Sequence, residues 1–296
     1  MIVRDKPTAI DLLLALRGSI VPHIAPSIAL QMLVACALVF AHSEWGWFPE
    51  VGGLAFSTFG VALSLFLGFR NNAAYERWWE ARRLWGGLLA DLRSLARETE
   101  MFVPDSALRL SLLRTILAFI HLHRANLRGL ADDPQALRLG GEFMQAPHPP
   151  DAALNRIAAQ IAQAAQAGQI DGFGLKALGE RLASITAQQA GCERIAGTPL
   201  PYVYSLLIYR TTWLFCLLLP LALLGPVGWL TPVFVGIVGY VFLGLAEVTE
   251  ELSHPFALSA NGLPLDAICR AAEISLAPHL GEEAPAPLAA RDYFLS

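Results

Sequence analysis

The sequence predicts an all-α membrane protein with four transmembrane helices in each subunit and a helical cytosolic domain. Of its 296 residues, 55% are hydrophobic and only 16% are charged, whereas soluble domains are about 25% charged. The hydrophobic residues gather in two blocks, 20–69 and 200–246, and most of the charge lies between them. A soluble core helix has no need to be apolar on every side over such lengths, but a bilayer requires it.

The first element is a short cytosolic or interfacial helix within residues 1–20. Its apolar run is only a few residues long and no small-residue cleavage site follows, so we do not expect a removed signal peptide. Two uncharged membrane helices come next, Val21–Ala41 and Val51–Phe69, and they make up the section 21–69. Each has the length of about 20 residues that a hydrocarbon core of about 30 Å requires.

The middle segment, 70–199, is too polar to cross a bilayer. Apolar residues recur in it at helical spacing over four stretches, and clusters of proline, aspartate and glycine separate them. The stretches are Leu84–Phe102, Leu108–Leu127, Ala152–Ala167 and Leu175–Ile195. We therefore expect a helical cytosolic domain that begins with an extension of the second membrane helix.

The second hydrophobic block, 200–246, predicts membrane helices over Tyr202–Leu224 and Val227–Ala246. The first of them is apolar apart from Arg210. The remaining residues, 247–296, predict one more short helix and a mobile cytosolic tail.

The positive charges orient these helices, because cytoplasmic loops carry an excess of Lys and Arg. Of the 21 Lys and Arg residues, three precede the first membrane helix, fifteen lie within 70–194, two follow the fourth helix, and the last is Arg210 within the third. The short loops 42–50 and 225–226 contain none. We therefore expect both termini and the middle segment in the cytoplasm.

Several classes of function are disfavoured by composition and motif. A net charge of -4 argues against a nucleic-acid partner. His121 and His123 resemble a metal pair, but residues i and i+2 point apart on a helix, and no catalytic constellation, metal site or cofactor motif is evident. The four cysteines lie far apart and are expected to be reduced thiols; they are Cys36, Cys192, Cys216 and Cys269.

The second membrane helix and its continuation carry the most specific motif. The run RNNAAYERWWEARRLWG at Arg70–Gly86 resembles the signature of the bestrophin family, in its prokaryotic branch. The segment Gly197–Arg210 is similar to the one that leads into that family's third span, and HPF at His254–Phe256 stands where the family has Asn-Pro-Phe. The resemblance implies a homopentameric ion channel of the bacterial inner membrane, with a central five-fold pore lined by the second span.

The resemblance further implies an apolar pore neck at Val61, Leu65 and Phe69. Their i, i+4, i+8 spacing places them on one helix face. Three stacked rings of five apolar side chains form a constriction that water leaves readily, which makes a hydrophobic gate. Spacing alone would favour packing against neighbouring helices or lipid, and the motif favours the neck.

A second, narrower aperture is implied at the cytosolic exit, within Gly172–Leu178. The apolar candidates there are Phe173, Leu175 and Leu178, of which we expect Leu178.

Calcium-activated animal members of the family carry a run of acidic residues after the Pro-Phe pair. This chain has Ala257–Asp266 at that place, with a single carboxylate. Because calcium takes six to eight oxygen ligands, we expect no calcium clasp here.

Charged residues near the membrane helices admit two interpretations. Glu247, Glu250 and Glu251 could collect cations, but salt bridges to the Arg-rich foot of the second span are favoured. Arg210 is expected to reach the interface with its charged end or to pair with a carboxylate such as Glu247. The acidic residues slightly favour monovalent cations as the permeant ions.

The alternative function is a membrane transporter, or a membrane-anchored sensor or scaffold without a conducting pore. A transporter is expected to show inverted repeats, broken helices and polar sites at the bilayer midplane. The four spans show neither repeats nor such sites, so a channel is favoured, and an enzyme is the weakest interpretation.

Overall fold

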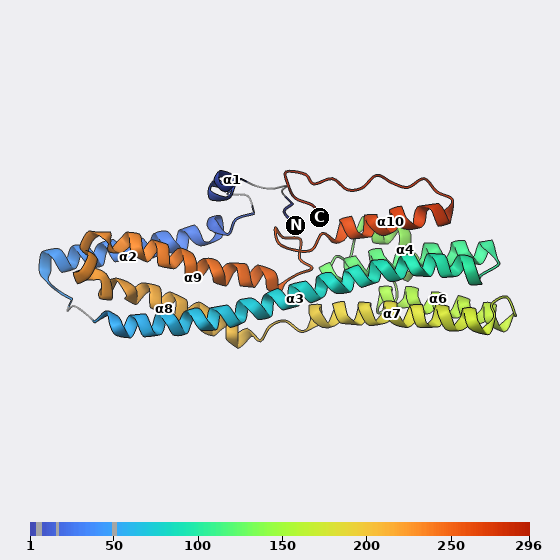
Figure 1. Cartoon of the computed structure of the whole chain (residues 1–296), viewed down its shortest axis with the longest axis horizontal. Helices are drawn as coiled ribbons and strands as arrows, with labels where there is room; N and C mark the ends of the chain where they lie inside the picture. The colour runs from blue at the N-terminus through green and yellow to red at the C-terminus, as the bar shows by residue number, and fades with distance from the viewer. Residues whose placement is uncertain (4–7, 16–17, 49–51) are drawn as a thin grey trace. The chain divides into compact units, whose positions relative to one another are not determined.

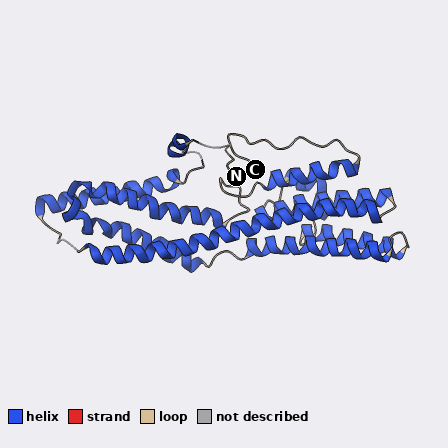
Figure 2. Cartoon of the chain, in the orientation of Figure 1, coloured by secondary structure: helices blue, strands red, loops and turns tan. Residues whose placement is uncertain are grey.

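The protein is described by a computed structural model over residues 1–3, 8–15, 18–48 and 52–296. Across these ranges it is helical, and its β-structure consists of isolated bridges near the chain ends (Figures 1 and 2). Val51, the expected start of the second membrane helix, lies outside the described residues. The all-α prediction is confirmed.

The longest helix has 50 residues and the others are much shorter. The helices are α1 (Ala9–Leu14), α2 (Val21–Trp45), α3 (Gly53–Phe102), α4 (Ser106–Arg128), α5 (Pro134–Gly140), α6 (Pro149–Gln166), α7 (Gly172–Gly197), α8 (Tyr202–Val227), α9 (Thr231–Ser253) and α10 (Leu265–Leu280), with 3₁₀ turns η1 (Gly141–Phe143) and η2 (Gly228–Leu230).

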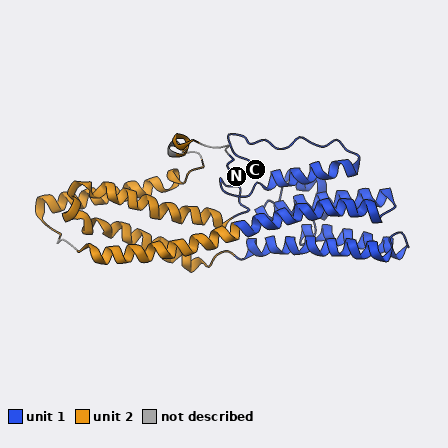
Figure 3. Ribbon diagram, viewed as in Figure 1, with its two compact units in different colours: residues 1–4, 79–198, 255–296 blue, residues 5–78, 199–254 orange. Residues whose placement is uncertain are grey.

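The chain divides into two compact units (Figure 3). The first, called here the polar unit, comprises residues 1–4, 79–198 and 255–296. The second, called the apolar unit, comprises residues 5–78 and 199–254. The helix α3 contributes residues to both units.

In the apolar unit α2, α8 and α9 run side by side and contact one another (Figure 1). Stretches long and apolar enough to cross a membrane are Val21–Trp45, Gly53–Phe102 and Tyr202–Ser253. The last of these holds two helices, because Gly228 has a φ of +52° at the end of α8 and η2 follows it. Glycine adopts that backbone conformation without a steric penalty.

The core of the apolar unit joins α3 to the other three helices. Its buried side chains come from all four, and the rings of Phe59 and Phe215 lie 5.6 Å apart. They are Ala35, Leu63, Leu67, Ile208, Phe215, Cys216, Leu219 and Val235.

The polar unit is built around α4, which contacts α5, α6, α7 and α10. Trp85 and Phe119 are among its largest fully buried side chains. The helix α5 was not foreseen from the sequence. Asp133 caps it by accepting hydrogen bonds from two backbone N–H groups, and Pro134 occupies its first turn, a combination that commonly begins a helix.

The last residues of the chain make backbone hydrogen bonds to other segments, whereas the sequence predicts a mobile tail. The backbone N–H of Leu295 donates to the Met1 carbonyl at 2.9 Å, and the N–H of Ala267 donates to Ser296 at 2.9 Å. These bonds pair backbone polar groups at both chain ends.

Candidate functional site: an apolar face on α3

Val61, Leu65 and Phe69 form one exposed face of α3. Their exposed fractions are 71%, 56% and 62%. The opposite face of the same helix holds Leu63 and Leu67, which are 3% and 0% exposed in the core of the apolar unit. In this subunit the three predicted neck residues therefore contact little, and their apolar face is available to another partner.

Polar residues bracket this face along the helix. Thr58 lies one turn before Val61, and Asn72 lies one turn after Phe69, both on exposed positions. The Thr58 hydroxyl donates to the Leu54 carbonyl at 3.0 Å, so its hydrogen bond is made within the helix. The apolar zone is thus short, three residues over about 12 Å of helix axis.

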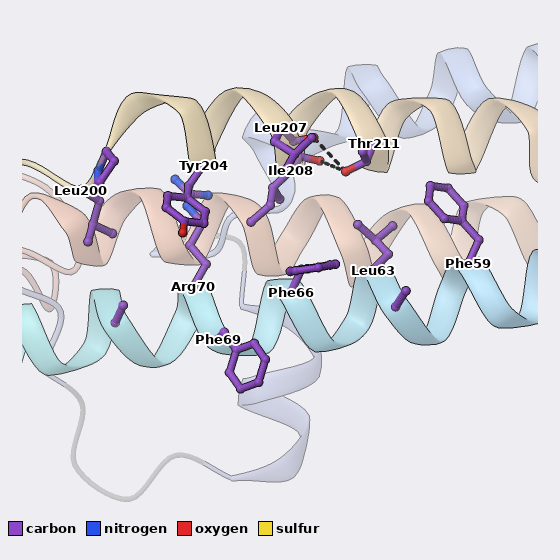
Figure 4. A pocket seen from close by; sticks show the side chains of 13 residues that line it. Phe59, Leu63, Phe66, Phe69, Arg70, Leu200, Tyr204, Leu207, Ile208 and Thr211 are labelled. Atoms are coloured by element: carbon purple, nitrogen blue, oxygen red, sulfur yellow. Dashed lines mark hydrogen bonds between the residues drawn. The ribbon is translucent and has the colours of Figure 1, made fainter.

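The flank of α3 that faces α8 borders an apolar cavity of about 550 Å³. Leu63 and Phe66 line it from α3, and Tyr204 and Ile208 line it from α8 (Figure 4). Phe69 lies at its edge and projects from the side of α3 away from α8 (Figure 4).

Arg70 ends the apolar stretch of α3 and is neutralised by a partner. It is 8% exposed, and its Nη2 donates to Ser205 Oγ at 2.8 Å and to Glu250 Oε2 at 2.7 Å. The salt bridge expected between the acidic cluster and the Arg-rich foot is therefore confirmed for Glu250. The charge of Arg70 is held among α8 and α9 and away from the exposed face that carries Phe69.

Arg210 is exposed on α8, and the described residues form no ion pair with it. The expected pairing with Glu247 is thus not found. An exposed position near the end of an apolar helix fits the other expectation, a long side chain that reaches the interface.

Leu178 on α7 is completely buried, at 0% exposure. It shares its helix face with Gly174 and Ile185, which are also buried. In this structure Leu178 exposes no surface that could line an aperture, and the position of the aperture stays a prediction. The two other candidates, Phe173 and Leu175, are 83% and 41% exposed.

Asp266, the single carboxylate of the segment after Phe256, is engaged by two arginines. Its Oδ1 lies 2.8 Å from Arg124 Nη1, and its Oδ2 accepts from Arg128 Nη1 at 2.9 Å. Burial would raise the pKa of Asp266, but the hydrogen bond and charge of Arg128 and the charge of Arg124 outweigh it and lower the pKa. Both oxygens are therefore already used.

The two histidines of the His-x-His pair point to different surroundings. His121 Nε2 lies 2.8 Å from Glu273 Oε1. His123 is fully buried between the rings of Trp85 and Phe119, and burial, together with the charge of His148, lowers its pKa to about 3. Over the described ranges, no group of three His, Cys, Asp or Glu side chains is placed to hold a metal.

One polar cavity was missed by sequence reasoning. It lies among α2, α8 and α9 and holds Ser27, Tyr202 and Tyr209 beside Arg70 and the acidic residues. No local motif marks it, because its residues come from four helices.

The sequence matches a family model described as Bacterial/Fungal Bestrophin protein over residues 1–278. A protein of Mesorhizobium japonicum named voltage-dependent anion channel-forming protein is 44% identical over 307 residues, which cover 100% of this chain and 97% of that protein. A protein of Escherichia coli K12 with the same descriptive name is 39% identical over 97% of this chain and 96% of its own length.

Solved structures agree with these matches. A crystal structure of a bacterial bestrophin homologue from Klebsiella pneumoniae superposes with a TM-score of 0.81 and 31% identity, and the match covers 86% of this chain and 98% of that one. A second crystal structure, of a membrane protein, gives a TM-score of 0.83 and 32% identity over 88% and 99% of the two chains.

Proposed function

The chain belongs to the bacterial and fungal bestrophin family, and we propose on this premise that it is a passive channel for small monovalent ions. The family consists of channels and not enzymes, so the prediction that this chain is not an enzyme is confirmed. In our proposal five copies assemble around a central pore, and α3 of each copy lines it.

The observation that carries the proposal is the exposed apolar face of α3. Val61, Leu65 and Phe69 are more than half exposed on a helix whose opposite face is buried. Exposed apolar faces of this kind mark contacts with other proteins or with lipid, and membership of the bestrophin family favours contact between copies of α3. Five such faces around one axis give three apolar rings, and a hydrophobic constriction of this kind gates by dewetting.

The cavity between α3 and α8 supports self-association. It is apolar, about 550 Å³ in volume, and bordered by Phe66 and by the exposed Tyr204 and Leu207. In the proposed homopentamer a neighbouring subunit covers this surface, because a closed ring uses the same contact five times.

We further propose four membrane crossings, by α2, by the first part of α3, by α8 and by α9. The helices α8 and α9 have 26 and 23 residues, which exceed the roughly 20 that a crossing requires. The charge distribution then puts both termini and the polar unit in the cytoplasm of a bacterium, below its inner membrane.

Charged residues of this chain and the names of its relatives favour opposite signs for the permeant ion. The apolar neck carries no charge, and Arg70 beneath it is paired with Glu250. The acidic residues Glu247 and Glu251 in the last turns of α9 favour cations, whereas relatives from several bacteria carry names that specify an anion channel.

At the cytosolic exit we propose that Phe173 and Leu175, the exposed candidates on α7, form the second aperture in place of Leu178. We also propose that the channel has no calcium clasp of the animal type. The support for this is that the two oxygens of Asp266 face Arg124 and Arg128.

Currents across planar bilayers that contain the purified protein test the function. Discrete single-channel steps are expected. A reversal potential in an asymmetric salt gradient assigns the sign of the ion. Ion flux without steps, or no flux in bilayers that demonstrably contain the protein, would favour the transporter or the sensor instead.

A further inference from the structure

The polar cavity of the apolar unit, lined by residues of α2, α3, α8 and α9, has a volume of about 440 Å³ and several polar side chains in its lining. Hydroxyls of Ser27, Tyr202 and Tyr209 border it together with Arg70 and two glutamates. Polar groups in an otherwise apolar membrane unit are costly unless a partner satisfies them. Tyr202 and Tyr209 are themselves exposed, whereas Arg70 is buried, and together these groups provide hydrogen-bonding partners for a polar occupant.

Two of the side chains that border the cavity, one cationic and one acidic, have hydrogen-bonding atoms without a partner among the described residues. Arg70 is 8% exposed, and although its Nη2 is bonded to Ser205 and Glu250, its buried Nε has no hydrogen-bond partner among the described residues. Glu247 is half-buried, and no hydrogen bond or ion pair joins it to the part of the chain that the structure describes. The cavity is thus bordered by a cation with one unsatisfied N–H group, which is itself buried, and by a carboxylate without a partner among the described residues.

We propose that this cavity binds the headgroup of a zwitterionic phospholipid that carries a primary ammonium, as in phosphatidylethanolamine. The phosphate accepts from Arg70, and the ammonium donates to Glu247. Both contacts are charge-assisted hydrogen bonds, which are among the stronger polar contacts. A ligand with one charge of each sign satisfies both groups and leaves the net charge of the cavity unchanged.

The walls of the cavity indicate a lipid as the source of this headgroup. Ile24, Leu206 and Leu243 line it beside the polar residues, and they offer an apolar surface to the first part of an acyl chain. Arg70 also follows directly after the apolar stretch of α3, where the headgroups of a bilayer lie in our proposed topology.

The site is separate from the neck. Arg70 lies on the α8 side of α3, and Phe69 projects from the other side (Figure 4). Lipid binding can be measured without ionic current, so a failure of this proposal and a failure of the channel proposal give different results.

Native mass spectrometry of the delipidated, detergent-solubilised protein tests the proposal. The probes are dioleoyl phosphatidylethanolamine, phosphatidylcholine and phosphatidylglycerol with identical acyl chains. The ethanolamine lipid should bind about tenfold more tightly than either of the others, the factor expected for one charge-assisted hydrogen bond. Phosphatidylcholine lacks an N–H donor for Glu247, and phosphatidylglycerol lacks the ammonium.

Glu247→Gln should lower the affinity for the ethanolamine lipid to the value measured for phosphatidylglycerol. The affinity for phosphatidylglycerol should stay unchanged. Glu44→Gln is the matched control, because Glu44 is an exposed residue of the same unit outside the cavity. If Glu247→Gln does not purify as a folded protein, the comparison of the three lipids on the unaltered chain decides.

Equal binding of the three lipids, or a preference that survives in folded Glu247→Gln, would overturn the proposal. Displacement of the ethanolamine lipid by free O-phosphoethanolamine at a similar concentration would overturn the lipid assignment, because it would show that the apolar wall contributes nothing.

Discussion

Substitutions on the exposed face of α3, at Leu65 and Phe69, should change the single-channel conductance. Phe69→Ala or Leu65→Ser should raise the single-channel conductance, since a wider or more polar ring retains water more readily. Because both side chains are more than half exposed in the subunit, its free energy of unfolding should change by less than about 0.5 kcal/mol.

Leu67→Ala is the control for that prediction. Leu67 is 0% exposed on the opposite face of α3, and its truncation leaves a cavity that should lower stability by about 2 kcal/mol or more. An unchanged conductance in both Phe69→Ala and Leu65→Ser would remove these residues from the ion pathway.

Asp266 makes the polar unit sensitive to acid. Its pKa is lowered in the folded protein, so it stabilises the fold above its ordinary pKa of 3.8 and loses this contribution as the pH falls through the folded value. Asp266→Asn should lower the free energy of unfolding near pH 7 by about 1.5–3 kcal/mol, because the charge-assisted hydrogen bond to the buried Arg128 is weakened.

Thermal unfolding followed by circular dichroism between pH 7 and pH 3 checks the effect of Asp266. The variant should show a flatter decline with acid than the unaltered protein, and Glu283→Gln, an exposed substitution in the same unit, should behave like the unaltered protein. A decline of equal slope in Asp266→Asn would contradict the assignment.

For single residues, the sequence predicts which side chains share a helix face but not which of them are buried by packing against other helices. The common face of Val61, Leu65 and Phe69 follows from spacing. The burial of Leu178 does not, because apolar side chains occur on both sides of the first turns of α7. Leu178 lies on the packed side and Phe173 and Leu175 lie on the exposed side, and only tertiary contacts distinguish the two.

Among the helices, α7 provides the sharpest test. Phe173→Ala and Leu175→Ala should alter conductance or ion selectivity, since these side chains are exposed at its first turn. Leu178→Ala should leave conduction of the assembled channel unchanged and lower the stability of the polar unit by about 2–5 kcal/mol, as other buried Leu→Ala changes do.

Bilayer recordings and denaturation of the same three variants separate the two effects. Should Leu178→Ala alter ion selectivity while Phe173→Ala and Leu175→Ala do not, the aperture would lie at the residue that the sequence first suggested.

Helix positions were largely predictable from the sequence, and their ends less so. The long helix α3 followed from an apolar stretch that passes into an amphipathic one without proline. The helix α5 was missed because seven residues are too few to show a period. Only the capping pair Asp133-Pro134 could have revealed it.

For the whole molecule, the channel is expected to conduct without calcium. Chelation of calcium by EGTA on either side of the bilayer should leave the open probability unchanged, since the carboxylate at the position of the animal clasp is held by two arginines. A current that disappears on chelation and returns with added calcium would contradict this expectation.

Assembly is the level at which one sequence is least informative. A pore on a five-fold axis needs copies of the same face, and neither spacing nor burial within one subunit states how many copies meet. The motif at Arg70–Gly86 gave this expectation through the resemblance to the family, whereas the exposed face of α3 and the apolar cavity beside it are equally compatible with another subunit and with lipid.

The most direct test of the central claim is thiol modification of Leu65→Cys during single-channel recording. A charged methanethiosulfonate reagent should block or reshape the current in this variant, and a reducing agent should restore it. Phe66→Cys is the matched control, because Phe66 is equally exposed in the subunit, at 57% beside 56%, but lies on the flank that lines the α8 cavity. Modification that changes the current through Leu65→Cys and not through Phe66→Cys is the predicted result; a current through Leu65→Cys that the reagent does not alter would contradict a pore lined by α3.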